Sequence, residues 1–242
     1  MAAAWIGFAG GVTAALVSAF VAFRQTRMAE QMTKLKSALD AEVHRADALF
    51  DRDLQAEQVL TRYRQPLAAA AFDLQSRLYN ILRQGLFDAY GSDPRRGEEV
   101  LRTTVFRLAQ YFGWTEILRR DIQFLSFPED EETRRVSKLQ SDITKCFLSD
   151  GYGQALMIWS DEQRAVGERM IAEEHGKVLC MGYARFSDRF EDTFASWRER
   201  LRSELPQESA RGRLRDVQHL LCELVETLDE REIYYPHDLE RA

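Results

Sequence analysis

The sequence predicts an all-α protein in which a single membrane-spanning helix continues into a helical stalk and then into a multi-helix bundle. Residues 1–23 contain no Asp, Glu, Lys or Arg, and residues 24–64 contain no Gly or Pro. Beyond them, apolar residues recur three or four positions apart, which is the period of a helix with one buried face. We therefore expect a transmembrane helix at 1–23, a stalk suited to coiled-coil formation at 24–64, a cytoplasmic α-helical domain at 65–232 and a tail at 233–242.

The overall composition hides this division. The 242 residues include 33 basic and 39 acidic side chains, for a net charge of -6, with only 13 Gly, 5 Pro and 3 Cys. These counts exclude the collagen-like, low-complexity and disulfide-scaffold classes. Residues 1–120 hold 16 basic and 13 acidic groups, whereas residues 121–242 hold 17 and 26. The basic excess lies in the half nearest the predicted span, where anionic headgroups attract it.

The uncharged segment has the length of a membrane span. Its 22 residues after Met1 form roughly 33 Å of helix at ~1.5 Å per residue, which matches a hydrocarbon core of about 30 Å. A cleaved signal peptide is the main alternative, but no basic residue precedes the apolar run and the sequence before Arg24 is a poor cleavage site. Basic residues dominate the C-terminal flank, which the positive-inside rule places in the cytoplasm. We expect a single-pass protein of the inner membrane with its N-terminus outside.

Small residues follow one face of this span. Gly7, Gly11, Ala15 and Ala19 recur every four residues, a spacing that allows the backbones of membrane helices to approach closely. We interpret this face as a packing surface between copies of the chain, against the alternative that small residues fall at this spacing by chance. Thr13 and Ser18 are the two hydroxyls of the span. They are candidates for lining a pore, although hydrogen bonds to their own helix are the simpler role.

The predicted stalk carries an apolar stripe. The spacings along it are 4, 3, 4, 4, 3, 4 and 4 residues, in the order Met28, Met32, Leu35, Leu39, Val43, Ala46, Phe50 and Leu54. This is a helical stripe with a stutter relative to a strict heptad. So long a helix needs partners along its length. Parallel self-association supplies them, and folding back onto the downstream domain is the alternative.

Proline, glycine and capping residues indicate where the helices of the domain begin, bend or end. We expect Pro66 to begin a new helix, Asp93 to cap a helix that starts at Pro94, and Gly113 to kink that helix. Ser160 and Gln163 have the spacing of a capping box. From Tyr183 the sequence predicts one helix with a core-facing aromatic stripe at Phe186, Phe190, Phe194 and Trp197.

Two short apolar runs interrupt this helical pattern, at 154–159 and 178–181. They are compatible with a minimal pair of strands. We favour buried loop and helix ends.

Motifs for chemistry are missing from the sequence. It contains no phosphate loop, dinucleotide fingerprint, HExxH, GxSxG or CxxC. Cys146, Cys180 and Cys222 are far apart and fit reduced thiols in apolar helix faces. His175 and Cys180 lack further ligands for a metal. We expect a protein that is not an enzyme and that needs no cofactor or metal.

Arginine supplies most of the positive charge of the domain. One group of arginines is interleaved with Tyr63, Tyr79 and Tyr111 and could form a surface that binds phosphates and stacks on bases. The alternative is ordinary helix pairing, such as Asp73 with Arg77. The candidate residues for an anionic ligand are Arg62, Arg64, Arg77, Arg83, Arg95, Arg96, Arg102 and Arg107.

This layout of span, stalk and helical domain resembles the single-span effectors of bacterial antiphage systems, such as the channel component of the Hailong system. The resemblance covers the organisation of the whole chain and includes no specific motif, so it assigns no residue. It implies a homo-oligomer whose spans form a pore that the cytoplasmic domains hold shut until a nucleotide or oligonucleotide acts on them. The alternative is a membrane-tethered scaffold that recruits a cytoplasmic protein partner.

Overall fold

The computed structural model describes the backbone of residues 2–122, 131–174 and 176–242. The side chains of residues 2–23, 26, 29–30, 52–61 and 122 are outside this description. The described backbone is mostly helical, which confirms the all-α class. Two compact units are present, Met1–Asp51 and Arg52–Ala242, and each is described by itself.

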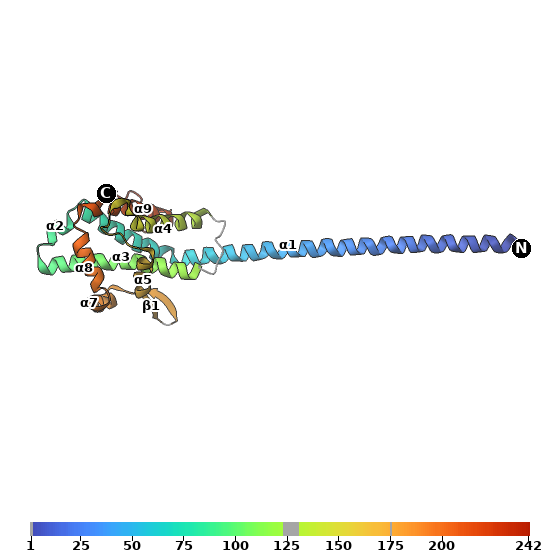
Figure 1. The fold of residues 1–242 in the computed structure, drawn as a ribbon, viewed down its shortest axis with the longest axis horizontal. Coiled ribbons are helices and arrows are strands. Elements are labelled where there is room, and N and C mark those ends of the chain that lie inside the picture. Colours follow the sequence, from blue (N-terminus) through green and yellow to red (C-terminus); the bar gives the residue numbers. More distant parts are fainter. Residues whose placement is uncertain (1, 123–130, 175) are drawn as a thin grey trace. The chain divides into compact units, whose positions relative to one another are not determined.

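The elements follow one another along the chain as in Figure 1. The helices are α1 (Ala2–Leu82), α2 (Leu86–Tyr90), α3 (Pro94–Ile122), α4 (Glu131–Leu148), the short 3-10 helix η1 (Asp150–Tyr152), α5 (Ser160–Met170), α6 (Tyr183–Asp188), α7 (Phe190–Thr193), α8 (Ala195–Glu204) and α9 (Glu208–Leu228). Strands β1 (Ile171–Glu174) and β2 (Lys177–Cys180) form an antiparallel hairpin.

No helix among the residues that the structure describes is long and apolar enough to cross a membrane. The side chains of the predicted span, residues 1–23, fall outside those residues, and helix α1 includes the backbone of Ala2 to Phe23.

The core of the second unit forms where several helices meet. Helix α3 packs along α5, and α4 packs along α9 (Figure 1). Side chains of α1, α3, α8 and α9 surround an apolar void of about 20 Å³, among them Leu74, Leu108, Leu201 and Leu214. The void is close to the minimum that holds one water molecule, so the interior is well filled.

Pro66 does not begin a new helix, which corrects the prediction. Helix α1 continues through Pro66 to Leu82. An internal proline costs about 3 kcal/mol because it removes one backbone hydrogen bond and crowds the preceding turn. Leu67 and Leu74 are buried directly after it, and fully burying such side chains contributes ~1.5–3 kcal/mol each. Tertiary packing of this face therefore outweighs the local penalty.

Gly113 also leaves its helix uninterrupted, since α3 runs from Pro94 to Ile122. A Cβ atom at this position would lie 2.7 Å from Cys180 Sγ and 2.8 Å from Met170 Cβ. Glycine is needed here for close approach of α3 to α5 and the hairpin. The prediction of a kink at Gly113 is therefore wrong.

The two capping predictions have different outcomes. Asp93 Oδ1 accepts hydrogen bonds of 2.9 Å from the N–H groups of Arg95 and Arg96, as expected for the cap of α3. At α5, Glu162 accepts a 2.8 Å hydrogen bond from the N–H of Trp159, one residue earlier than predicted. Gln163 is instead buried and donates to the carbonyls of Thr144 and Ile158. The predicted capping box of Ser160 and Gln163 is therefore wrong by one residue, and Gln163 packs in the interior.

The two apolar runs also have different outcomes. Residues 154–159 form an irregular segment without a strand, as favoured. Run 178–181 lies largely in β2, which is a correction, and its partner is β1 rather than 154–159. Helix α5 ends at Met170, and the strands Ile171–Glu174 and Lys177–Cys180 follow it as a hairpin.

The aromatic stripe is confirmed as core. Phe186, Phe190 and Phe194 are fully buried and Trp197 nearly so. The single helix predicted from Tyr183 is wrong, because the chain breaks into α6, α7 and α8.

Candidate functional site

The predicted span residues lie outside the described side chains. These are Gly7, Gly11, Ala15 and Ala19 for packing and Thr13 and Ser18 for a pore. Their roles stay predictions. The structure does place the eight predicted arginines, and it does not gather them into one surface.

Four of these arginines are exposed and a fifth, Arg102, is half-buried, on separate parts of the second unit. Arg62 lies on α1 before Pro66, and Arg83 follows the end of α1. Arg95 and Arg96 occupy the first turn of α3. Arg102 contacts Glu99 at 3.7 Å and lies over the ring of Phe190. These contacts are typical of ordinary surface arginines.

Arg77 and Arg107 come together between α1 and α3. Arg77 Nη2 donates to Thr103 Oγ1 at 3.1 Å, and Arg107 Nη1 donates to the carbonyl of Asp73 at 3.3 Å. Burial lowers the pKa of Arg77 to about 10, and the charge of Arg107 adds to this effect, whereas Asp73 opposes it. The reciprocal bonds join the two helices, so this pair has a structural role.

Arg64 is the predicted residue that lines a cavity of useful size. Arg64 on α1 forms an ion pair with Glu132 on α4, and its Nη1 lies 3.5 Å from the carbonyl of Leu228 at the end of α9. The cavity has a volume of about 470 Å³ and is lined by Arg64, Gln65, Ala68, Glu132, Leu228, Asp229, Glu230, Arg231, Ile233 and Tyr234. We call it the Arg64 cavity. Its volume suits a ligand of nucleotide size.

The segment after α9 forms one wall of this cavity. The carboxylate of Asp229 accepts hydrogen bonds from the N–H groups of Ile233, Tyr234 and Tyr235 at 3.1, 2.9 and 2.8 Å. Burial opposes ionisation of Asp229, but these three bonds outweigh it and lower its pKa. The turn holds Tyr234 at the cavity with 59% of its surface exposed. An exposed ring beside an arginine is a combination that binds nucleobases and phosphates.

Acidic side chains line the same cavity, so an anion that binds there competes with carboxylates for the arginine. Glu132, Asp229 and Glu230 line the same cavity, and Glu132 already pairs with Arg64. A phosphate that binds Arg64 must therefore displace Glu132 from it, and Arg231 is a second guanidinium in the lining. Sequence reasoning identified Arg64 but missed Glu132 and Tyr234. The adjacent pair Tyr234 and Tyr235, five and six residues after Asp229, was the available signal.

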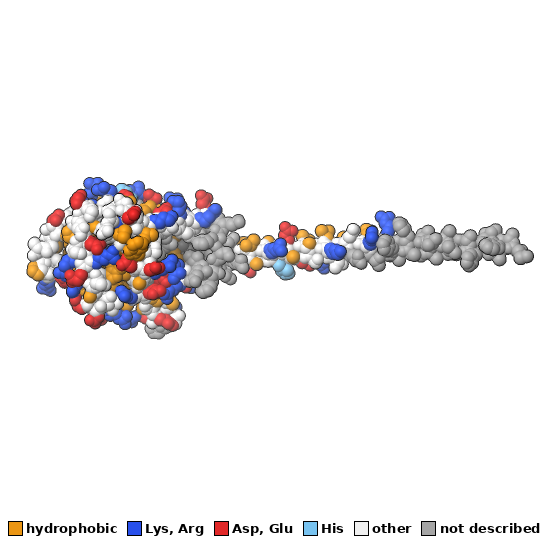
Figure 2. Space-filling view, in the orientation of Figure 1, with side chains coloured by type: hydrophobic (Ala, Val, Ile, Leu, Met, Phe, Trp, Pro, Cys, Tyr) orange, Lys and Arg blue, Asp and Glu red, His pale blue; other side chains and the backbone are white. Residues whose placement is uncertain are grey.

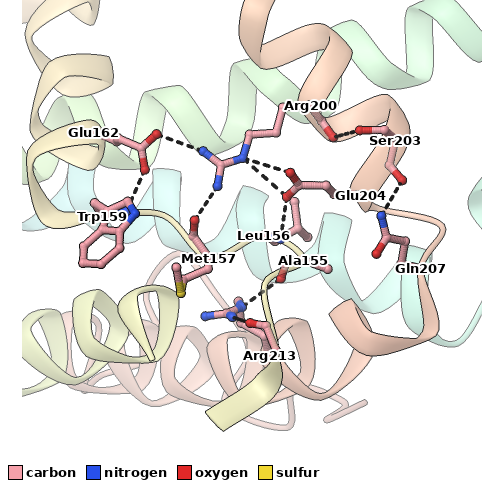
Figure 3. Close-up of polar contacts among 11 residues, drawn as sticks. Ala155, Leu156, Met157, Trp159, Glu162, Arg200, Ser203, Glu204, Gln207 and Arg213 are labelled. Carbon is pink, nitrogen blue, oxygen red and sulfur yellow. Dashed lines mark hydrogen bonds and ion pairs between the residues drawn. The ribbon is translucent and has the colours of Figure 1, made fainter. Parts of the chain in front are cut away.

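A second polar network fixes the irregular segment that precedes α5 (Figure 3). Arg213 is completely buried, and its guanidinium donates to four carbonyl groups, those of Cys146, Phe147, Gly153 and Ala155, at 2.7–3.1 Å. Burial lowers its pKa. Arg200 bonds Glu204, Glu162 and the carbonyl of Met157. The network satisfies backbone groups and leaves no free reactive atom, so we assign it a structural role.

The first unit carries an exposed apolar stripe on α1. Met28, Met32, Leu35, Leu39, Val43 and Phe50 have exposed fractions between 50% and 69%, and Figure 2 shows hydrophobic side chains along this helix. Ala46 is exposed in the same row. We call these seven residues the stalk stripe. Burying one large side chain of this kind contributes ~1.5–3 kcal/mol, so a row of them in water marks an interaction surface.

The described residues include no group of three or more side chains suited to hold a metal ion. Cys146, Cys180 and Cys222 are free thiols, and burial raises the pKa of each. They therefore lack the lowered pKa of a cysteine nucleophile.

No family model, curated protein or solved structure matches this chain.

Proposed function

We propose that the protein is a membrane-anchored homo-oligomeric effector or ion channel of bacterial antiphage defence, gated by its cytoplasmic helical domain through a nucleotide or oligonucleotide ligand. One observation carries the proposal. Helix α1 includes the uncharged segment 2–23 at one end and core residues such as Leu74 and Leu78 at the other. A single element thus supplies both the predicted span and part of the domain core.

Sequence chemistry supports the membrane part of the proposal. A span of 22 uncharged residues followed by Arg24 and Arg27 inserts with its C-terminal flank in the cytoplasm of the cell. The small-residue face of Gly7, Gly11 and Ala15 suits close packing between copies. Several spans packed in this way could surround Thr13 and Ser18 as a pore.

The Arg64 cavity supports the gating part. It combines Arg64, the exposed ring of Tyr234 and a volume of about 470 Å³. A phosphate that displaces Glu132 from Arg64 would break the ion pair between α1 and α4. Ligand binding would then act directly on the helix that contains the span.

Ion flux tests this function. Full-length protein in liposomes is expected to release an encapsulated dye or ion, with a rate that changes when adenine oligonucleotides or ATP are added. Replacing both Gly7 and Gly11 by Leu should abolish flux and oligomerisation together, whereas Ala2→Leu, outside the small-residue face, should leave both intact. Absence of flux from a membrane-inserted protein under every nucleotide condition would overturn the proposal.

A membrane-tethered scaffold is the second candidate, supported by a different surface. Val178 and Leu179 on strand β2 are 44% and 37% exposed, on a two-stranded sheet that offers open edges for another strand. Residues 121–242 also have a large acidic excess. Affinity capture of full-length protein and of Val178→Lys tests it. A stoichiometric protein partner lost in the variant supports the scaffold, and equal recovery or no partner argues against it.

A further inference from the structure

The stalk stripe repeats every eleven residues. Met28, Leu39 and Phe50 are separated by eleven positions each, Met32 and Val43 by eleven, and Leu35 and Ala46 by eleven, so the series covers two full repeats. All seven lie in one helix and are exposed. The apparent stutter in a heptad pattern is therefore a regular repeat of a different length.

An eleven-residue repeat has a definite geometric meaning. Eleven residues in three turns give about 3.67 residues per turn, slightly more than the ~3.6 of a straight helix, so a seam with this period winds to the right. A heptad seam would wind to the left. Polar Ser37 and His44 lie away from the stripe, because in projection they are roughly 120–160° from Leu39 and Phe50 at ~100° per residue.

We infer that the stalk stripes of two or more copies of this chain pack together in parallel and in register, as a straight to right-handed coiled coil. The inference rests on the proposed function, because a shared membrane fixes the direction of the helices. Chains whose first 23 residues cross one membrane in the same direction leave it side by side. Each copy then presents Met28, Leu39 and Phe50 at the same depth as its neighbour.

A second copy fits the stripe better than an unrelated partner. The repeat has constant spacing over residues 28–50, so in a parallel pair every apolar position opposes its own equivalent. The stripe is not in line with the small-residue face of the predicted span, because Ala19 and Met28 are nine residues, or about half a turn, apart in helical projection. The proposed stalk contact is therefore independent of that face.

Antiparallel pairing of two stalk stripes is the alternative to parallel pairing. The stripe is symmetric about Leu39, so in an antiparallel pair Met28 would oppose Phe50. Residues 24–38 carry four basic and one acidic group, and residues 39–53 carry two basic and five acidic groups. Charge alone favours antiparallel pairing. These charges are largely solvent-exposed and screened over ~8 Å at physiological ionic strength, whereas the membrane span imposes the parallel direction absolutely.

Cysteine cross-linking of the full-length chain in membranes tests the inference. The single variants Met28→Cys, Leu39→Cys and Phe50→Cys are each expected to form disulfide-linked dimers under mild oxidation, at least ~5-fold above Ser37→Cys and His44→Cys. Unaltered protein gives the background from Cys146, Cys180 and Cys222. Resistance to alkaline extraction and an unchanged protease pattern confirm that each variant is inserted and folded.

The outcomes separate this inference from the proposed function. If Leu39→Cys alone links to itself and Met28→Cys links to Phe50→Cys in mixed membranes, the stalks are antiparallel and both the inference and the shared span are wrong. If no stripe position links while flux in liposomes persists, the inference is overturned and the channel stands. If the stripe positions link but no flux occurs under any condition, the coiled coil stands and the channel is overturned.

Discussion

Arg64 on helix α1 and Glu132 in the first turn of α4 form an ion pair at the rim of the Arg64 cavity. The two side chains are 31% and 28% exposed, so the pair adds at most about 1 kcal/mol to stability. The role that we propose for the pair is in ligand binding rather than in stability. The pair occupies the guanidinium that the proposed anionic ligand would bind, and it joins the helix containing the predicted span to the remainder of the domain.

Removing Glu132 should therefore strengthen anion binding. In Glu132→Gln the guanidinium of Arg64 is free for phosphate, and we expect several-fold tighter binding of a fluorescent ATP analogue, measured by anisotropy. Arg64→Gln should bind at least ~10-fold more weakly, since a charge-assisted hydrogen bond contributes about 1.5–3 kcal/mol. Arg83→Gln, an exposed arginine away from the cavity, is the matched control. Equal affinities in all variants would remove the cavity as the ligand site.

Loss of Arg213 should destabilise the domain strongly. Its guanidinium bonds the carbonyls of Cys146, Phe147, Gly153 and Ala155, and Arg213→Met removes this donor from all four, although the carbonyl of Phe147 keeps its bond from the N–H of Ile158. Each acceptor left without a donor costs about 1–3 kcal/mol, so we expect a loss of at least ~3 kcal/mol in the thermal unfolding of detergent-solubilised protein. Arg213→Lys should also destabilise, because a compact ammonium cannot reach four dispersed carbonyls. A change in Tm no larger than that of Arg62→Met would contradict this role.

A methyl group at position 113 should disturb the core where α3 meets the hairpin. The added Cβ of Gly113→Ala would lie 2.7 Å from Cys180 Sγ and 2.8 Å from Met170 Cβ, and overpacking of this kind costs about 1–3 kcal/mol. The matched control is Gly182→Ala, whose Cβ meets no atom within 4 Å. The difference in Tm between the two variants measures the effect, and equal values would show that the contact relaxes freely.

Stability should fall as the pH rises above about 9. Burial raises the pKa of Cys180 to about 12 and that of Cys222 to about 11 from the ordinary value of 9.0. Between these values the unfolded thiols lose protons while the folded ones keep them, so alkali favours the unfolded state. Replacing both cysteines by Ala should flatten the decline in Tm between pH 9 and 11. An unchanged slope would assign the decline to other groups.

The helical class and much of the core followed from periodicity alone. The spacing predicts Phe186, Phe190, Phe194 and Trp197 in the core, and all four are buried. Proline and glycine were poorer guides to the helix boundaries than periodicity was. Pro66 and Gly113 act through packing against residues distant in sequence. The hairpin was missed for a related reason: Ile171–Glu174 resembles the end of a helix until its pairing with Lys177–Cys180 is known.

The candidate site was predictable only in part. Arg64 belonged to a group of eight arginines, and nothing in their spacing distinguished it from Arg95 or Arg102. Its cavity depends on Glu132 from α4 and on Tyr234 from the segment after α9, which lie 68 and 170 positions further along the chain. A single sequence carries no signal for such distant neighbours.

Pro66 gives the end of α1 a mechanical property. Proline has no N–H, so the carbonyl of Arg62 receives no hydrogen bond from the position four residues later. Bending α1 at this turn therefore breaks one backbone hydrogen bond fewer than bending elsewhere in a regular stretch. This compliant turn lies two residues from Arg64 and its ion pair. A force on the helix concentrates its curvature beside the residue that we expect to sense the ligand, so the same turn can serve as both hinge and trigger.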